Sequence, residues 1–158
     1  MPRTARQALG GMICHVLNRG NTRDRIFDDA ADYAGFEQVL TETQAEVFVR
    51  ILTYCLMPNH WHLILWPLED GDLGRFLQRL TTTLVRRCRL HLHSVGTGQL
   101  YQGTYKSFPI EEDHHLYTVL HYVERNAVRP TMVKRVEDWT WNSLWGWLHP
   151  TEHQEKPI

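Results

Sequence analysis

A short turn between two apolar runs constrains the fold of this chain most. The run "VFVRILTYCLM" (47–57) is rich in β-branched and aromatic residues, which is typical of a buried strand. Pro58 and Asn59 supply the turn, and "HWHLILWP" (60–67) continues as a second apolar run. Two strands joined by so short a turn pair as antiparallel neighbours. The sequence therefore predicts a β-hairpin on which the other elements pack.

Strand and helix patterns on either side of this hairpin indicate the fold class. We expect further strands at 12–18 and 104–110, and helices at 29–46, 71–93 and 113–129. Asp113 is the expected N-cap of the last helix, and Pro130 should stop it. The order strand, helix, strand, strand, helix, strand, followed by a helix, predicts a ferredoxin-like split β-α-β fold of the α+β class. The sheet would be antiparallel, with helices on one face.

The length of the chain indicates one domain. With 158 residues, 42% of them hydrophobic, the chain can bury a core of its own. We assign 1–150 to a single domain and expect 151–158 to be a disordered tail. The tryptophans near the end should pack against the domain: Trp139, Trp141, Trp145 and Trp147. No apolar run approaches the roughly 18 residues of a membrane span, and the first residues lack a signal-peptide pattern, so we expect a cytoplasmic protein.

Charged residues are segregated along the chain, although the net charge is only −1. Six acidic residues and no Lys or Arg lie between Asp28 and Glu46, whereas five arginines and no acid lie between Arg75 and His93. This segregation predicts one acidic and one basic face, and a basic face rich in arginine can bind phosphates. The alternative is that both runs are ordinary solvated helix faces.

Two histidines begin the second strand of the hairpin. Side chains at i and i+2 of a strand point to the same face, so His60 and His62 can bind one metal ion, while Trp61 faces the core. His91 and His93 have the same spacing on a predicted helix, where they diverge by about 200° and cannot share an ion. The strand pair is therefore the candidate metal site, and burial in the core is the alternative.

A second polar group lies on the last predicted helix. Tyr122 and Asn126 are one turn apart and share a face, which Arg125 and Arg129 flank. These groups suit a phosphodiester, although a solvated face would look the same. A tyrosine hydroxyl can attack phosphorus when a divalent cation polarises the phosphate, and the product is a covalent phosphotyrosine. Tyr117 is the rival nucleophile on this helix.

Five blocks of the sequence together resemble a known family. They are "HVLNRGN" (15–21), "YCLMPNHWHLIL" (54–65), "GQLYQGTYKS" (98–107), "YVERNAVRP" (122–130) and "WNSLW" (141–145). In this order they resemble the HUH single-tyrosine transposases of bacterial insertion sequences, most closely the REP-associated tyrosine transposases. The combination of the MPNHWH and YVERN blocks is specific, whereas either block alone is weak.

The resemblance implies an HUH nuclease fold and a set of residue roles. His60 and His62 would bind a divalent metal ion, Mg²⁺ or Mn²⁺, with Asn126 as third ligand and Tyr122 as nucleophile. The substrate would be single-stranded DNA with a hairpin, REP-like or at a transposon end, cleaved through a 5′-phosphotyrosine. The protein would act in the bacterial cytoplasm, associated with the nucleoid, as a monomer or homodimer. We expect DNA contacts from Asn18, Arg19, Arg23, Lys106, Arg125 and Arg129.

Three departures from the family pattern leave the substrate preference open. Thr104 replaces an arginine, Cys14 stands where tyrosine is common, and Ala127 replaces a proline after Asn126. Two other functions also stay open. One is a non-catalytic single-stranded nucleic-acid-binding module of ferredoxin-like fold. The other is a zinc hydrolase, which would need a third His, Cys or carboxylate ligand.

Overall fold

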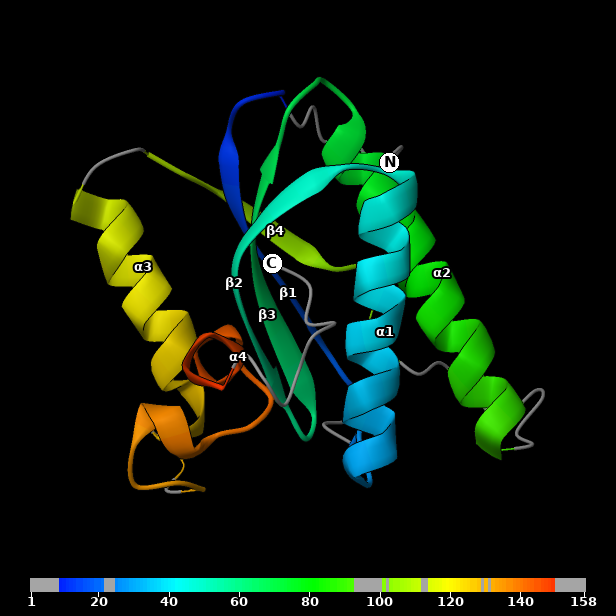
Figure 1. Ribbon diagram of the computed structural model, residues 1–158. Helices are drawn as coiled ribbons and strands as arrows, with labels where there is room; N and C mark the ends of the chain where they lie inside the picture. Colours follow the sequence, from blue (N-terminus) through cyan, green and yellow to red (C-terminus); the bar gives the residue numbers. More distant parts are fainter. Residues whose placement is uncertain are drawn as a thin grey trace.

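A four-stranded antiparallel sheet forms the centre of the computed structural model, which describes residues 9–21, 25–92, 101, 103–111, 114–128, 130 and 132–149 (Figure 1). Its strands are β1 (Ile13–Arg19), β2 (Val49–Met57), β3 (His60–Pro67) and β4 (Lys106–Ile110). They lie in the order β2-β3-β1-β4, and each neighbouring pair is antiparallel. This topology is the split β-α-β pattern, so the predicted α+β fold class and the hairpin are confirmed.

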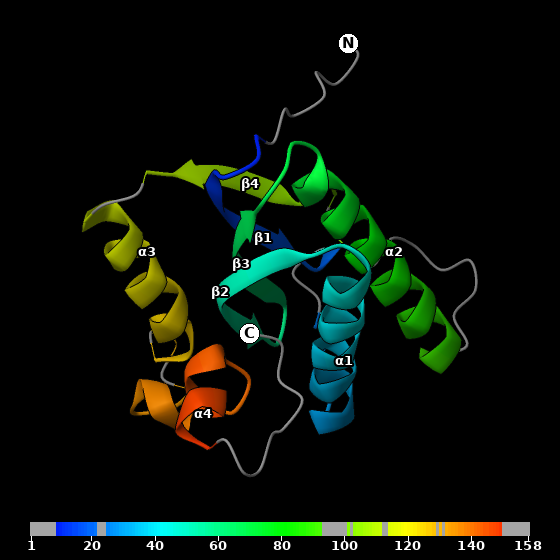
Figure 2. The same cartoon turned by 45° about the horizontal axis from the view of Figure 1, so that its top comes forward.

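Two long helices, α1 (Ala30–Glu46) and α2 (Asp72–Leu92), pack side by side on one face of the sheet (Figure 2). The main hydrophobic core lies between them and the strands, and Trp61, Leu63 and Leu65 of β3 are fully buried in it. These residues alternate along the strand, as expected for side chains that share a face. Trp61 thus faces the core, as the sequence predicts.

The opposite face of the sheet carries α3 (His114–Glu124), seen apart from α1 and α2 in Figure 1. A second core lies beneath it and includes Ile64 of β3, Cys55 of β2 and Val123 of α3. The expectation of helices on one face therefore holds for α1 and α2, but not for α3. The reason lies in the strands: Leu63 and Ile64 are adjacent, point to opposite faces and are both fully buried, so both faces need a cover.

The last predicted helix is shorter than expected. It ends at Glu124, and Arg125–Ala127 continue as a 3₁₀ turn, η2. Strand β4 likewise begins at Lys106 instead of 104. The expected cap Asp113 lies outside the described residues, as does the predicted tail 151–158.

The segment that follows α3 covers the outer edge of β2. The backbone N–H of Leu56 donates to the carbonyl of Trp141 (2.8 Å), and the Trp139 indole N–H donates to the carbonyl of Leu56 (2.9 Å). Asn142 follows these contacts and is the N-cap of helix α4 (Ser143–Leu148). Its side-chain oxygen accepts a hydrogen bond from the backbone N–H of Trp145. An exposed strand edge is prone to pair with other chains, so this cover also protects the sheet.

Not all of the tryptophans pack as predicted. Trp141 stacks on Tyr33 of α1 with ring centroids 5.0 Å apart, and Trp145 stacks on His149 at 4.2 Å. Trp147, in contrast, is 63% exposed. None of the helices in the described part of the chain is long and apolar enough to cross a membrane.

Candidate active site

His60 and His62 lie on the face of β3 that points toward α3. Their ring centroids are 5.1 Å apart, and His62 is only 6% exposed. The strand register places His62 between Cys55 of β2 and Leu17 of β1, and His60 opposite Arg19 of β1. The structure thus brings the two imidazoles together on one face, as the i, i+2 spacing predicts.

A third histidine, which sequence reasoning missed, completes this cluster. His15 of β1 has its Nε2 atom 2.9 Å from Nδ1 of His62, and the two rings stack with centroids 5.2 Å apart. Alternation along β1 puts His15 on the same face as Leu17, the strand neighbour of His62. That alternation can be read from the sequence. The pairing of β1 with β3, which brings the two histidines into contact, cannot.

Hydrogen bonds at the Nδ1 atoms leave the Nε2 atoms of the histidine pair as candidate metal ligands. Nδ1 of His60 is 2.7 Å from Oδ1 of Asn59. Because a carboxamide oxygen only accepts, His60 donates from Nδ1 and keeps its lone pair on Nε2. The bond from His62 to His15 likewise engages Nδ1 of His62. Such a partner on the second ring nitrogen is typical of histidines that bind metals.

The histidines are held neutral by their surroundings. Burial lowers the pKa of His15, and burial together with the charge of Arg19 lowers the pKa of His60. Burial, reinforced by the charges of His60, His15 and Arg19, lowers the pKa of His62 to about 3. Neutral imidazoles have the lone pair that a metal ion requires.

This neutrality predicts a loss of stability in acid. His62 titrates near pH 3 in the folded protein but near 6.5 when unfolded, so between these values protons bind the unfolded chain preferentially. Acidification from pH 7 to pH 5 should therefore lower the free energy of unfolding by about 2 kcal/mol through His62. Urea unfolding with a chelator present measures this loss. The variant His62→Asn should lack it, and equal pH dependence in both proteins would contradict the assignment.

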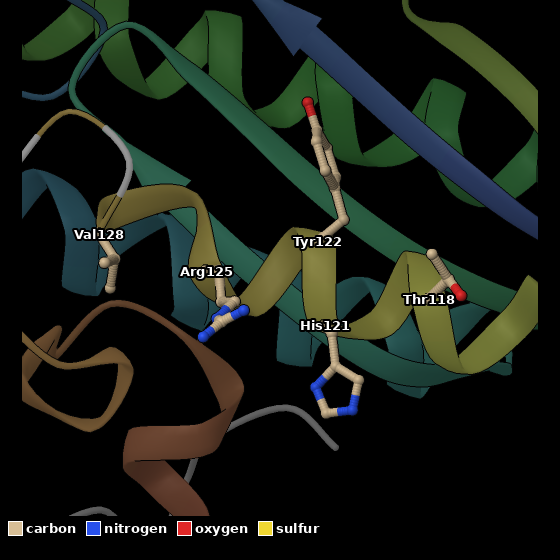
Figure 3. Close-up of a pocket in the computed structure, with 5 residues that line it drawn as sticks. All are labelled: Thr118, His121, Tyr122, Arg125 and Val128. Atoms are coloured by element: carbon tan, nitrogen blue, oxygen red, sulfur yellow. The ribbon is translucent and has the colours of Figure 1, made fainter.

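Tyr122 of α3 and Asn126 of the 3₁₀ turn that follows it lie beside the histidine cluster. The Tyr122 side chain points from α3 toward the strands, and its ring centroid lies 6.1 Å from that of His62 and 6.3 Å from that of His15 (Figure 3). Tyr122 is 39% exposed, so a substrate can reach it. Tyr117, the rival candidate for the nucleophile, is 66% exposed. The ring contacts with His15 and His62 are made by Tyr122, which favours Tyr122.

Asn126 is buried beside His60 with an unsatisfied amide. Asn126 is 8% exposed, and its contact with His60 opposes the lowering of the pKa of that imidazole by burial. Its Nδ2 atom has no hydrogen-bond partner among the described residues. Leaving a buried polar atom unpaired costs about 1–3 kcal/mol, so a bound group that contacts the amide would recover free energy. Since amide oxygen and nitrogen can exchange places by rotation, this group can be a cation or a phosphate oxygen.

The donor set that could hold a metal ion is therefore two imidazoles and one carboxamide. Among the residues that the structure describes, no three His, Cys, Asp or Glu side chains are placed to hold an ion. The zinc hydrolase alternative expects such a third ligand, and these residues do not provide it. Two nitrogen ligands and one amide oxygen leave coordination positions open for phosphate oxygens and water.

The residues expected to contact DNA are spread over several surfaces. Arg19 is exposed on the face of the histidines, and its charge acts on both His60 and His62. Asn18, in contrast, is buried on the opposite face, across from Trp61, which leaves it away from the histidine cluster.

The remaining predicted contacts differ in their placement. Lys106 is exposed on β4, opposite Leu17 of β1. Arg125 lines an open groove of about 780 Å³ with Thr118, His121, Tyr122 and Val128. Figure 3 shows Arg125 and His121 pointing away from the strands, in the opposite direction to Tyr122, so Arg125 does not flank the hydroxyl as expected. Arg23 and Arg129 lie outside the described residues.

The basic run of α2 is partly neutralised within the protein. Arg79 forms an ion pair with Glu46 of α1 (2.9 Å), and Arg87 pairs with Glu42 (2.7 Å). Arg75 pairs with Asp72 in the first turn of α2 itself. The prediction of separate acidic and basic faces is thus wrong for these residues, because the fold sets the acidic run of α1 against the basic run of α2. Both helices also lie on the face of the sheet away from the histidines.

Comparison with known proteins places the chain in a family. Residues 9–126 match the model of the IS200-like transposases. The chain belongs to this family. The match contains the histidine pair, Tyr122 and Asn126, and it confirms at family level the resemblance seen in the sequence blocks. No curated protein sequence matches this IS200-like transposase.

Solved structures share the fold of this IS200-like transposase. The structure of a REP-associated tyrosine transposase bound to a REP hairpin is 18% identical, with a TM-score of 0.72 over 99% of this chain and 89% of that one. A putative transposase from Deinococcus radiodurans R1 is also 18% identical, with a TM-score of 0.54 over 79% of this chain and 95% of that one. At this level of identity the likeness shows a common fold.

Proposed function

We propose that this IS200-like transposase cleaves and rejoins single-stranded DNA beside a hairpin, with Tyr122 as the nucleophile. The observation that carries the proposal is the approach of Tyr122 to His62, at 6.1 Å between ring centroids, from an element that packs on the same face of the sheet. A non-catalytic binding module has no need for a tyrosine beside neutral, hydrogen-bonded histidines. The family and the hairpin-bound relative support DNA as the substrate.

His60, His62 and Asn126 would hold the divalent metal ion, Mg²⁺ or Mn²⁺. Both histidines have a hydrogen-bonded Nδ1 atom that leaves Nε2 for coordination. Beside them, the buried amide nitrogen of Asn126 has no hydrogen-bond partner among the described residues. The ion, when bound, polarises the scissile phosphate and offsets the negative charge that develops on it. The lowered pKa values of the histidines keep these ligands available at neutral pH.

Tyr122 supplies the covalent step. Its hydroxyl oxygen forms a bond to phosphorus while the bond from phosphorus to the 3′ oxygen breaks. The phenol loses its proton, and the departing 3′ oxygen gains one. The products are a 5′-phosphotyrosine and a strand that ends in a free 3′ hydroxyl. Attack of a 3′ hydroxyl from a second strand reverses the reaction and transfers the strand, because the phosphodiester bond energy is conserved.

One assay tests this function directly. The protein is incubated with Mg²⁺ and a single-stranded oligonucleotide that carries a hairpin and a label at its 3′ end. The label should migrate with the protein on a denaturing gel, because the 5′ phosphate of the 3′ fragment stays on Tyr122. Cleavage without an adduct would support a hydrolase instead, and binding without cleavage would support the non-catalytic module.

His15 acts as a positioning residue in this scheme. If Nε2 of His62 binds the metal ion, its Nδ1 carries the proton and donates to Nε2 of His15, which fixes the ring orientation. The variant His15→Phe, which keeps a ring but removes the acceptor, should weaken Mn²⁺ binding by about 10- to 100-fold. Mn²⁺ titration of the DNA-free protein, followed by electron paramagnetic resonance, measures it. His15→Gln, which retains an acceptor, should recover part of the affinity. Unchanged affinity in His15→Phe would refute this role.

A further inference from the structure

The face of the sheet that holds the histidines is only partly covered by α3. The contacts of α3 with the sheet are mainly with β2 and β3, and the Tyr122 ring reaches toward β1. On the edge strand β4, Phe108 is 52% exposed. It is absent from both hydrophobic cores, so its exposed ring contributes little to the packing of the domain.

The strand register fixes where Phe108 lies relative to the site. Phe108 is directly opposite His15 of β1, so the two side chains share a face and their Cβ atoms are roughly 5 Å apart. His15 in turn contacts His62 and lies 6.3 Å from Tyr122 between ring centroids. Phe108 is thus one strand away from the reacting group, on the side that α3 leaves open.

Positive charge borders the same open area. Lys106 lies two residues before Phe108 on β4, on the same face and exposed. Arg19 is exposed on that face of β1, and its charge reaches His60 and His62. An exposed aromatic ring with cationic side chains beside it suits a single strand, because a base stacks on the ring while phosphates contact the charges.

We propose that Phe108 and Lys106 bind the single-stranded segment of the substrate next to the cleaved phosphate. Phe108 stacks on a nucleobase, and Lys106 contacts the backbone beside that base. This inference rests on the proposed function for its substrate, and it names a binding surface outside the set formed by Tyr122, His60, His62 and Asn126.

The test measures DNA affinity without cleavage, by fluorescence anisotropy in EDTA. The probes are a DNA hairpin with a single-stranded flank and the same hairpin without the flank. For the flanked probe, Phe108→Ala should weaken binding by about 5- to 100-fold, and Phe108→Trp should keep the affinity of the unmodified protein. For the unflanked probe, Phe108→Ala should have little effect. Lys106→Gln should reduce the salt dependence of binding to the flanked probe by about 0.7 in log–log slope.

Trp147→Ala is the matched control, because Trp147 is also an exposed aromatic residue, on α4, and lies away from β4. It should leave both affinities unchanged, and thermal unfolding of each variant verifies folding. Equal binding of the flanked probe by Phe108→Ala and the unmodified protein would overturn the inference, as would an equal loss with both probes. Adduct formation without a Phe108 effect refutes this surface alone, whereas a Phe108 effect without adduct formation refutes the catalytic proposal alone.

Discussion

Tyr122→Phe should abolish the covalent adduct and reduce strand cleavage by roughly 10³-fold or more, while hairpin affinity stays within about twofold. The substitution removes only the hydroxyl oxygen that would bond to phosphorus. The remaining phenyl ring can keep the edge-on contacts that Tyr122 makes with His15 and His62, so the geometry of the site should persist. The 3′-label assay reports the adduct, and anisotropy in EDTA reports the affinity.

The same helix provides a control for this variant. Tyr117 is 66% exposed on α3 and was the rival nucleophile in the sequence. Tyr117→Phe should form the adduct at the rate of the unmodified protein. An adduct that persists in Tyr122→Phe but disappears in Tyr117→Phe would reverse the assignment. An adduct that persists in both variants would place the nucleophile elsewhere.

The parts of the site that can be predicted from sequence depend on local geometry. The i, i+2 spacing of His60 and His62 on a strand fixes their common face wherever the strand lies. The one-turn spacing of Tyr122 and Asn126 also survives, although the helix changes to a 3₁₀ turn after Glu124. Both relations involve neighbours along the chain, for which the backbone period alone decides the direction of the side chains.

The parts that were missed depend on pairing between distant segments. His15 joins His62 only because β1 pairs with β3 in one register, and Phe108 joins them through the pairing of β1 with β4. The same reason explains why the prediction of separate acidic and basic faces was wrong. Arg79 and Glu46 are far apart in sequence and meet only because α1 packs on α2. Alternation along a strand shows which residues share a face, but not which strand lies beside it.

A buried polar contact on β2 connects the end of α3 with the sheet. Thr53 of β2 has its hydroxyl 2.5 Å from that of Ser143 at the start of α4 and 3.5 Å from a carboxylate oxygen of Glu124. Burial raises the pKa of Glu124. One strand residue thus connects the end of α3 with the C-terminal segment. Because Tyr122 lies only two residues before Glu124, this contact helps to hold Tyr122 in register with the histidines.

His60→Ala should weaken Mn²⁺ binding by more than about 100-fold and abolish cleavage, while the fold and hairpin binding in EDTA persist. Loss of an outer hydrogen-bond partner typically weakens metal binding by 10- to 100-fold, so loss of a direct ligand should do at least as much. His60 suits this test better than His62, because it is half-buried at the start of β3, whereas His62 is almost fully buried. Mn²⁺ titration and the 3′-label assay give the two readouts.

His121→Ala is the matched control for His60→Ala. His121 is exposed on α3 and points away from the strands, so its loss should change neither Mn²⁺ affinity nor cleavage (Figure 3). In the unmodified protein, chelation of the metal by EDTA should abolish cleavage, as His60→Ala does. If His60→Ala binds Mn²⁺ normally yet fails to cleave, the imidazole acts on the substrate itself. If it cleaves normally, the two histidines of the strand do not form the metal site, and their neutral, buried state serves the fold.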